Sequence, residues 1–72
     1  MGIDMKINGR KIKELMVING WNTSDIADLA GLSRPTISKG IHGGDMAPAS
    51  ITKLYNALNI ELDELIDWGH DG

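Results

Sequence analysis

The sequence has no cysteine, no long apolar run and no base after Lys53. The lack of cysteine excludes both a disulfide framework and a thiolate metal site. No apolar run approaches the roughly 18 residues that a membrane-spanning helix needs, and the first residues lack the layout of a signal peptide. We therefore expect a soluble, cytoplasmic protein with no membrane partner. Because disulfides and thiolate metal sites are excluded, the packing of helices must stabilise the fold.

The charge balance is acidic, with a net charge of −3. Taken alone, this value argues against a nucleic-acid partner. The distribution changes that conclusion, because residues 1–53 hold all seven bases and five acids, whereas residues 54–72 hold five acids and no base. Such asymmetry indicates an anion-facing surface in the first part of the chain and an acidic end remote from it.

The length of 72 residues and the apolar content of 42% predict one small globular domain over residues 1–72. Its expected core spans residues 8–67, between a short N-terminal tail and an acidic C-terminal tail. No nucleophile, base and acid are assembled by any motif, so we expect no enzyme, no cofactor and no small-molecule site. His70 beside Asp67 and Asp71 lacks the spacing of a metal site and is expected in a solvated tail.

Apolar residues at helical spacing, interrupted by capping residues, predict five short helices and no strand. The expected boundaries are Asn8 to Asn19-Gly20, Asn22 or Thr23 to Gly31, Ser33 to Gly43-Gly44, Pro48 to Asn59, and a short turn that carries Leu62, Leu65 and Ile66. The side chains expected to face inward include Ile12, Leu15, Met16, Ile18, Ile26, Leu29, Ala30, Ile51, Leu54, Tyr55 and Leu58. The aromatic residues Trp21, Tyr55 and Trp68 are expected in the core or at its rim.

The second and third helices have the features of a helix-turn-helix. Two helices that cross at a steep angle need a small residue where their backbones approach, and Ala27 supplies it. The turn needs a residue that tolerates positive φ, and Gly31 supplies that. Ile37 then fits as the apolar anchor of the third helix. Together these features predict a helix-turn-helix in which the second helix braces the third.

The stretch "WNTSDIADLAGLSRPTISK", followed by "LYNALNIELDELI", resembles the phage-repressor-type (Cro/C1, xenobiotic-response-element) helix-turn-helix family. The resemblance covers about residues 8–67. The matching positions are Ile26-Ala27, Gly31, Leu32-Ser33 and Thr36-Ile37-Ser38. Membership implies an all-α, compact, lambda-repressor-like five-helix bundle. It also implies a regulator of transcription, most simply a repressor, that binds double-stranded operator DNA, usually as a homodimer.

The resemblance also implies a DNA-binding site in which the helix at residues 33–42 enters the major groove. The residues expected to contact bases are Arg34, Pro35, Thr36, Ser38 and Lys39. The residues expected to contact phosphates are Asn22, Thr23, Ser33, His42 and Gly44. Simpler interpretations stay open beside these roles: solvated surface charges for Arg34 and Lys39, helix caps for Thr23 and Ser33, and a surface position for His42.

Two departures from the family pattern stand in the third helix and the loop after it. Gly40 replaces an apolar residue and Ile41 replaces a polar one, so either Ile41 takes over the anchoring or the helix ends early, near Gly40. The loop "GGDMAP" lacks the basic residues often found there, and Asp45 would repel a phosphate. Lys53, Lys11 and Arg10 are candidates to compensate.

The rival interpretation is a protein-interaction module, such as an antitoxin-like or regulatory partner with weak or no DNA binding. Its support is the negative net charge, the acidic segment 61–71 and an expected apolar patch around Trp68, Ile66 and Tyr55.

Overall fold

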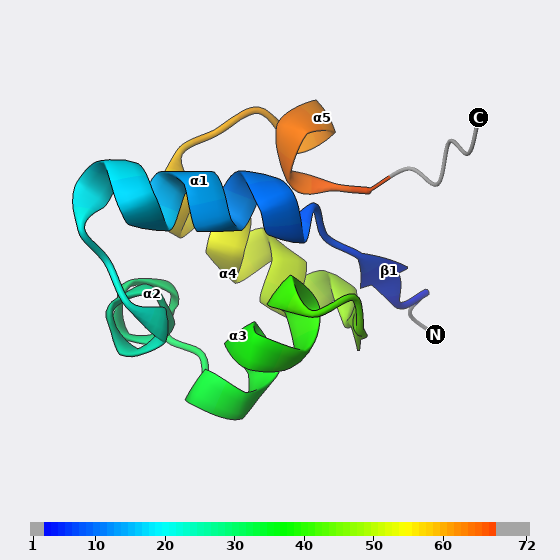
Figure 1. Ribbon diagram of the computed structural model, residues 1–72. Helices are drawn as coiled ribbons and strands as arrows, with labels where there is room; N and C mark the ends of the chain where they lie inside the picture. Colours follow the sequence, from blue (N-terminus) through cyan, green and yellow to red (C-terminus); the bar gives the residue numbers. More distant parts are fainter. Residues whose placement is uncertain (1–2, 68–72) are drawn as a thin grey trace.

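The computed structural model describes residues 3–67 as five helices and one short pair of strands (Figure 1). Trp68 and His70 lie outside the described residues. In chain order the elements are β1 (Met5–Lys6), α1 (Gly9–Asn19), α2 (Thr23–Ala30), α3 (Arg34–Ile41), β2 (Asp45–Met46), α4 (Pro48–Leu58) and α5 (Leu62–Leu65). All five predicted helices are present. Within residues 3–67, none of them is long and apolar enough to cross a bilayer.

The helix boundaries follow local capping interactions. The side chain of Asn8 accepts a hydrogen bond from the Lys11 amide, and Ser33 accepts one from the Thr36 amide, so each satisfies an amide that lacks a partner within its helix. Pro48 occupies the first turn of α4, where its missing N–H costs nothing. Asn59 ends α4 in the left-handed conformation, with φ of 54°. These starts and ends confirm the predicted boundaries.

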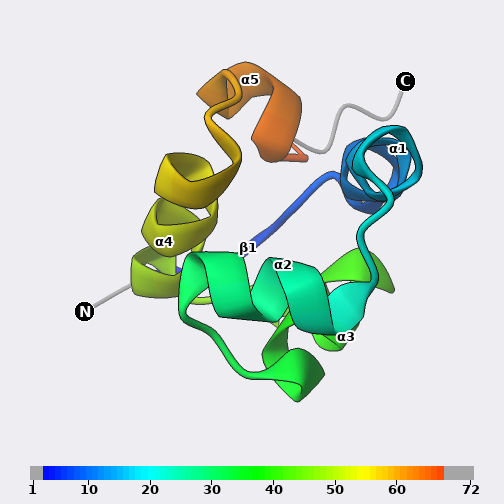
Figure 2. The same cartoon turned by 90° about the vertical axis from the view of Figure 1, so that its left-hand side faces the viewer.

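The core lies between the helices, with α1 and α4 on opposite sides, α2 and α3 below and α5 above in the view of Figure 2. Helix α2 contacts α3 and α4, and α1 contacts α3 and α5. Among the described residues, five side chains are less than 2% exposed: Ile12, Ile26, Ile37, Leu54 and Leu65. Trp21 packs against this core while partly exposed, as predicted.

Several residues expected inside the protein are exposed instead. Ile18 is 70% exposed and Leu29 is 51% exposed, because the inward stripes of α1 and α2 run through other positions. Tyr55 and Leu62 are exposed to 41% and 45%. Ile66, which was expected in an exposed apolar patch, is only 4% exposed and belongs to the core. The described part of that patch therefore reduces to Tyr55.

The prediction of no strand is wrong for two short segments. Met5 pairs with Met46 and Lys6 with Asp45 in an antiparallel β1–β2 ladder. Ile7 extends this pairing by an isolated bridge to Ile66 and is 3% exposed, so the stretch before residue 8 contributes to the core rather than forming a tail. Two-residue strands are too short to show an alternating pattern in the sequence, and their pairing depends on residues about 40 positions apart.

The α3–strand contact also explains Gly40. A Cβ atom at Gly40 would lie 2.6 Å from Sδ of Met46 and 3.0 Å from Cδ1 of Ile7, so the absent side chain makes room for the strands. Helix α3 continues to Ile41, which is 8% exposed. Of the two alternatives, the structure therefore supports the one in which Ile41 takes over the anchoring of the helix.

Candidate nucleic-acid interface

Helices α2 and α3 form a helix-turn-helix around Gly31. Gly31 adopts φ of 70°, and the amide of Leu32 donates to the carbonyl of Ala27 at 2.9 Å, which closes α2. Ala27 is 3% exposed, as its place near the helix crossing requires. Ile37 is 1% exposed and holds the inner face of α3 against the core. The outer face of α3 is thereby fixed relative to the bundle.

The five residues predicted to contact bases all lie on α3, with unequal exposure. Arg34, Pro35 and Lys39 are exposed, whereas Thr36 and Ser38 are half-buried. The Thr36 hydroxyl lies 2.8 Å from Oγ of Ser33, so both hydroxyls already take part in the start of the helix. The accessible groups at this face are thus one guanidinium, one ammonium and one pyrrolidine ring.

A surface hollow joins the outer face of α3 to the start of α2. Thr23, Arg34, Pro35 and Ser38 line it. Nη1 of Arg34 donates to Oγ of Ser24 at 3.4 Å, which draws the guanidinium toward the first turn of α2. Sequence reasoning missed Ser24, because its relevance depends on the crossing of α2 and α3 and on no local pattern.

The start of α2 carries a capping box. The side chain of Asn22 accepts from the Asp25 amide, and the Asp25 carboxylate accepts from the Asn22 amide, both at 2.9 Å. The Asn22 side chain is therefore occupied as a cap. Thr23 follows as the first helical residue, where backbone N–H groups have no partner within the helix and suit an anion.

The last two residues predicted to contact phosphate lie just after α3. Nδ1 of His42 donates to the carbonyl of Ser38 at 2.8 Å, which leaves the far edge of the ring exposed. The amide of Gly44 donates to the carbonyl of Lys39 at 2.8 Å, so this backbone donor is already used. A Cβ atom at Gly44 would meet the Lys39 side chain, which means that Gly44 sets where the stem of Lys39 lies.

Comparison with family models gives one match, in which the Cro/C1-type HTH DNA-binding domain covers residues 11–71. The chain belongs to the Cro/C1-type helix-turn-helix family. Neither the curated proteins nor the solved structures gave a match. The matched range includes α2, the glycine turn and α3, so the geometry described above is that of a Cro/C1-type DNA-binding domain.

Within the described residues 3–67 of this Cro/C1-type domain, Lys6 and Lys11 form ion pairs. Nζ of Lys6 lies 3.1 Å from the Asp45 carboxylate and also donates to the carbonyl of Gly43. The repulsion expected from Asp45 is therefore partly cancelled by an adjacent cation. Lys11 lies 3.2 Å from both Glu64 and Glu14.

The environment of Lys11 removes it from the candidates for DNA contact. Hydrogen bonds to Glu64 and then Glu14 raise the pKa of Lys11 above its usual 10.5, because both carboxylates favour the charged ammonium. The Lys11 ammonium thus links α1 to α5 through Glu64. The expectation that Lys11 compensates for the poorly basic loop has no support in this arrangement.

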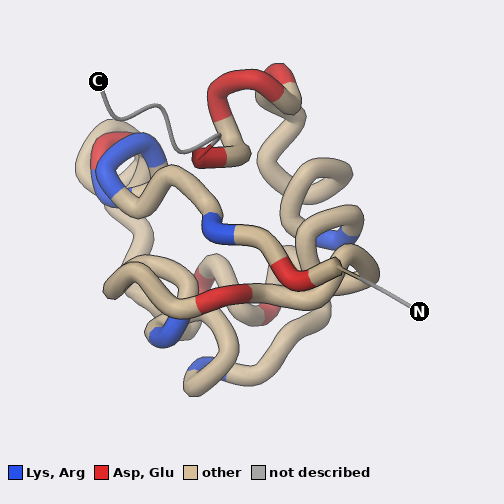
Figure 3. Tube along the Cα trace, turned by 90° about the vertical axis from the view of Figure 1, so that its right-hand side faces the viewer, with Lys and Arg blue, Asp and Glu red and all other residues tan. Residues whose placement is uncertain are grey.

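Five cations of the Cro/C1-type domain have no acid within 4 Å among the described residues: Arg10, Lys13, Arg34, Lys39 and Lys53. Figure 3 shows the basic positions of α1 and of α3 along one side of the molecule, with the acidic positions of α5 at its top. The acids of α5 therefore lie away from α3, whereas Asp45 lies on β2, which contacts α3, and is paired with Lys6.

Proposed function

We propose that this Cro/C1-type domain is a sequence-specific regulator of transcription, most simply a repressor, that reads operator DNA with α3. The observation that supports this best is the outer face of α3. Arg34, Pro35 and Lys39 are exposed there, and the hollow lined by Thr23 joins them to the start of α2. A helix with its N-terminal half exposed, beside the N-terminus of its bracing helix, is the arrangement that enters a major groove.

The proposed division of roles follows from the chemistry of each side chain. The planar guanidinium of Arg34 matches the O6 and N7 acceptors of guanine in two parallel hydrogen bonds. Lys39 donates to the same acceptors as a point charge, and the ring of Pro35 offers apolar contact to a thymine methyl group. Thr23 and its amide hold a phosphate, and Asn22, Ser33 and His42 are the further proposed phosphate contacts.

We further propose that two copies bind together. One α3 presents two cations to the groove, and the chain as a whole carries −3, so a single subunit gains little electrostatic affinity. A two-fold dimer doubles the contacts and places its two reading helices one helical turn apart, about 34 Å.

Selection of bound sequences from a random duplex pool, with the purified full chain, tests the proposal. We expect enriched sites that are palindromic, with half-sites about 10 base pairs apart centre to centre. Arg34→Ala and Lys39→Ala should each weaken binding to the enriched site on the order of 5- to 100-fold and relax its sequence preference. Thr23→Ala should weaken binding to enriched and scrambled sites equally, because a phosphate carries no sequence information.

The rival function, a protein-interaction module, predicts a different result. Such a module shows no retention on duplex DNA even at low salt, and its selection enriches no sequence. Enrichment that persists unchanged in Arg34→Ala and Lys39→Ala would instead leave DNA binding intact and reject α3 as the reading helix. A reporter with the enriched site across its promoter then distinguishes repression from activation.

A further inference from the structure

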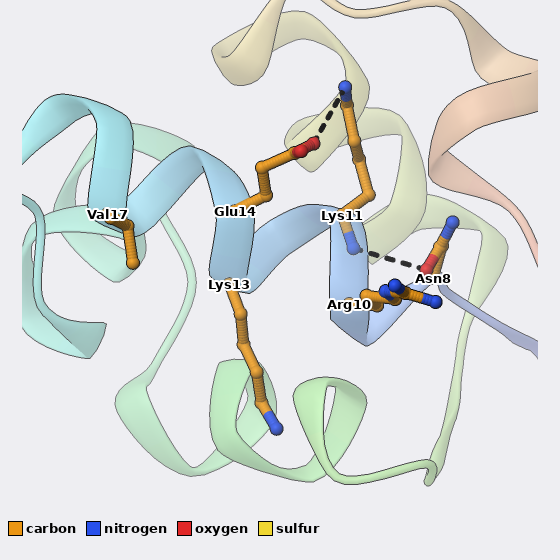
Figure 4. Close-up of a pocket in the computed structure, with 6 residues that line it drawn as sticks. All are labelled: Asn8, Arg10, Lys11, Lys13, Glu14 and Val17. Carbon is orange, nitrogen blue, oxygen red and sulfur yellow. Dashed lines mark hydrogen bonds and ion pairs between the residues drawn. The ribbon is translucent and has the colours of Figure 1, made fainter.

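Two cations of α1 are left without a role by the proposed contacts of α2 and α3. Arg10 and Lys13 are three residues apart, so they share one face of the helix, and both are exposed. Figure 4 shows Lys13 directed away from Lys11 and Glu14, on the side of α1 where α2 and α3 lie. Lys11 is paired with acids, whereas Arg10 and Lys13 have none within 4 Å among the described residues.

The start of α1 is held directly against the end of α3. A Cβ atom at Gly9 would collide with the carbonyl oxygen of Ile41, which shows that the two backbones touch with no side chain between them. Arg10 is the next residue, and Lys13 lies one helical turn further along α1. Both cations are thereby fixed to the same rigid body as the outer face of α3.

The surroundings favour a polyanion as the partner of this edge of α1. The unpaired cations of α1 and α3 lie on one side of the molecule, and the acids of α5 lie elsewhere (Figure 3). A helix that fills a major groove brings the edges of its own domain toward the phosphates that border that groove. Cations on such an edge meet phosphates and not bases, because α3 occupies the groove itself.

We propose that Arg10 and Lys13 form a second contact surface for the sugar–phosphate backbone of the DNA whose groove α3 occupies. This inference rests on the proposed function and adds two phosphate contacts from α1 to those at the start of α2. It accounts for how an acidic chain with only two cations on α3 obtains affinity, since each phosphate that a cation neutralises releases counterions.

The test compares single variants that each remove one positive charge: Arg10→Gln and Lys13→Gln on the proposed surface, and Lys11→Gln on the same helix as the matched control, because Lys11 is paired with Glu14 and Glu64. Binding to duplex DNA is measured from 0.05 to 1 M salt, on the enriched site and on a scrambled site. We expect Arg10→Gln and Lys13→Gln each to reduce the slope of log affinity against log salt by about 0.9. Over the decade from 1 M to 0.1 M salt, that difference in slope makes each variant lose about 8-fold in affinity relative to wild type, equally on both sites.

The control outcomes separate this inference from the proposed function. Lys11→Gln should leave the slope unchanged because Glu14 and Glu64 already neutralise that charge, and Arg10→Lys should keep the wild-type slope because it keeps the charge. Equal slopes for wild type, Arg10→Gln and Lys13→Gln, with Arg34→Ala still impaired, would overturn the α1 surface and leave the proposed function standing. An equal reduction in all three glutamine variants would also overturn it, since only overall charge would then matter. Failure of the wild-type chain to bind any duplex would defeat both proposals.

Discussion

Replacement of Gly9 by alanine tests the contact that fixes α1 against α3. The added Cβ atom would collide with the carbonyl oxygen of Ile41 and lie 3.0 Å from its carbonyl carbon. Both atoms belong to the backbone of α3 in its last turn, so no side chain can rotate out of the way. The start of α1 and the end of α3 must therefore move apart.

The magnitude follows from two opposing effects. Overfilling a packed contact costs about 1–3 kcal/mol. Alanine regains at most about 1 kcal/mol over glycine through its better helix propensity, and less at the first helical position. We therefore expect the free energy of unfolding to fall by about 1–2 kcal/mol. For a domain of this size the melting temperature should fall by roughly 4–16 °C.

The matched control is Gly40→Ala, at a second helical glycine that packs closely against its neighbours. Its Cβ atom would meet Sδ of Met46 at 2.6 Å and Cδ1 of Ile7 at 3.0 Å, which are ends of flexible side chains. These ends can move, whereas the backbone of Ile41 cannot rotate away, so the cost of Gly40→Ala should be smaller than that of Gly9→Ala. Urea unfolding followed by far-UV circular dichroism measures both. A Gly9→Ala variant as stable as wild type, or more stable than Gly40→Ala, would refute the backbone contact.

Three further perturbations have definite expected outcomes. Leu65→Ala should lower the free energy of unfolding by about 2–5 kcal/mol in urea titration, because Leu65 is 0% exposed; a loss under 1 kcal/mol would contradict its burial. Asn22→Ala should cost about 0.5–2 kcal/mol by removing the capping box of α2, with Asn56→Ala near zero as the exposed control. Because the pKa of Lys11 is raised in the folded state, its pairs with Glu64 and Glu14 stabilise the fold at pH below the usual 10.5 and lose that effect as the pH rises through the higher folded value. The gap in urea midpoint between wild type and Lys11→Met should accordingly narrow between pH 9 and pH 12, and a constant gap would show that packing of the stem, not charge, is responsible.

The sequence by itself determined where the helices begin and end. Asn8, Ser33 and Pro48 start helices, and Gly31 and Asn59 end them, because each acts on backbone groups within about four residues of its own position. The helix-turn-helix follows from the same local chemistry, so α3 and its outer residues were predictable. The assignment of Arg34 and Lys39 as DNA contacts came from the family resemblance and stays a prediction.

Only the tertiary structure decided which faces are covered and which charges are paired. The β1–β2 ladder, the room that Gly40 leaves for Met46 and the link from Lys11 to Glu64 all join residues that no local pattern connects. The exposure of Ile18 likewise depends on which elements pack against α1, and the apolar side chain alone does not reveal this. Burial and pairing are properties of contacts between distant segments, whereas helix boundaries are properties of neighbouring residues. Which cations of α1 and α3 remain without an acidic partner among the described residues is therefore decided only when the chain is folded.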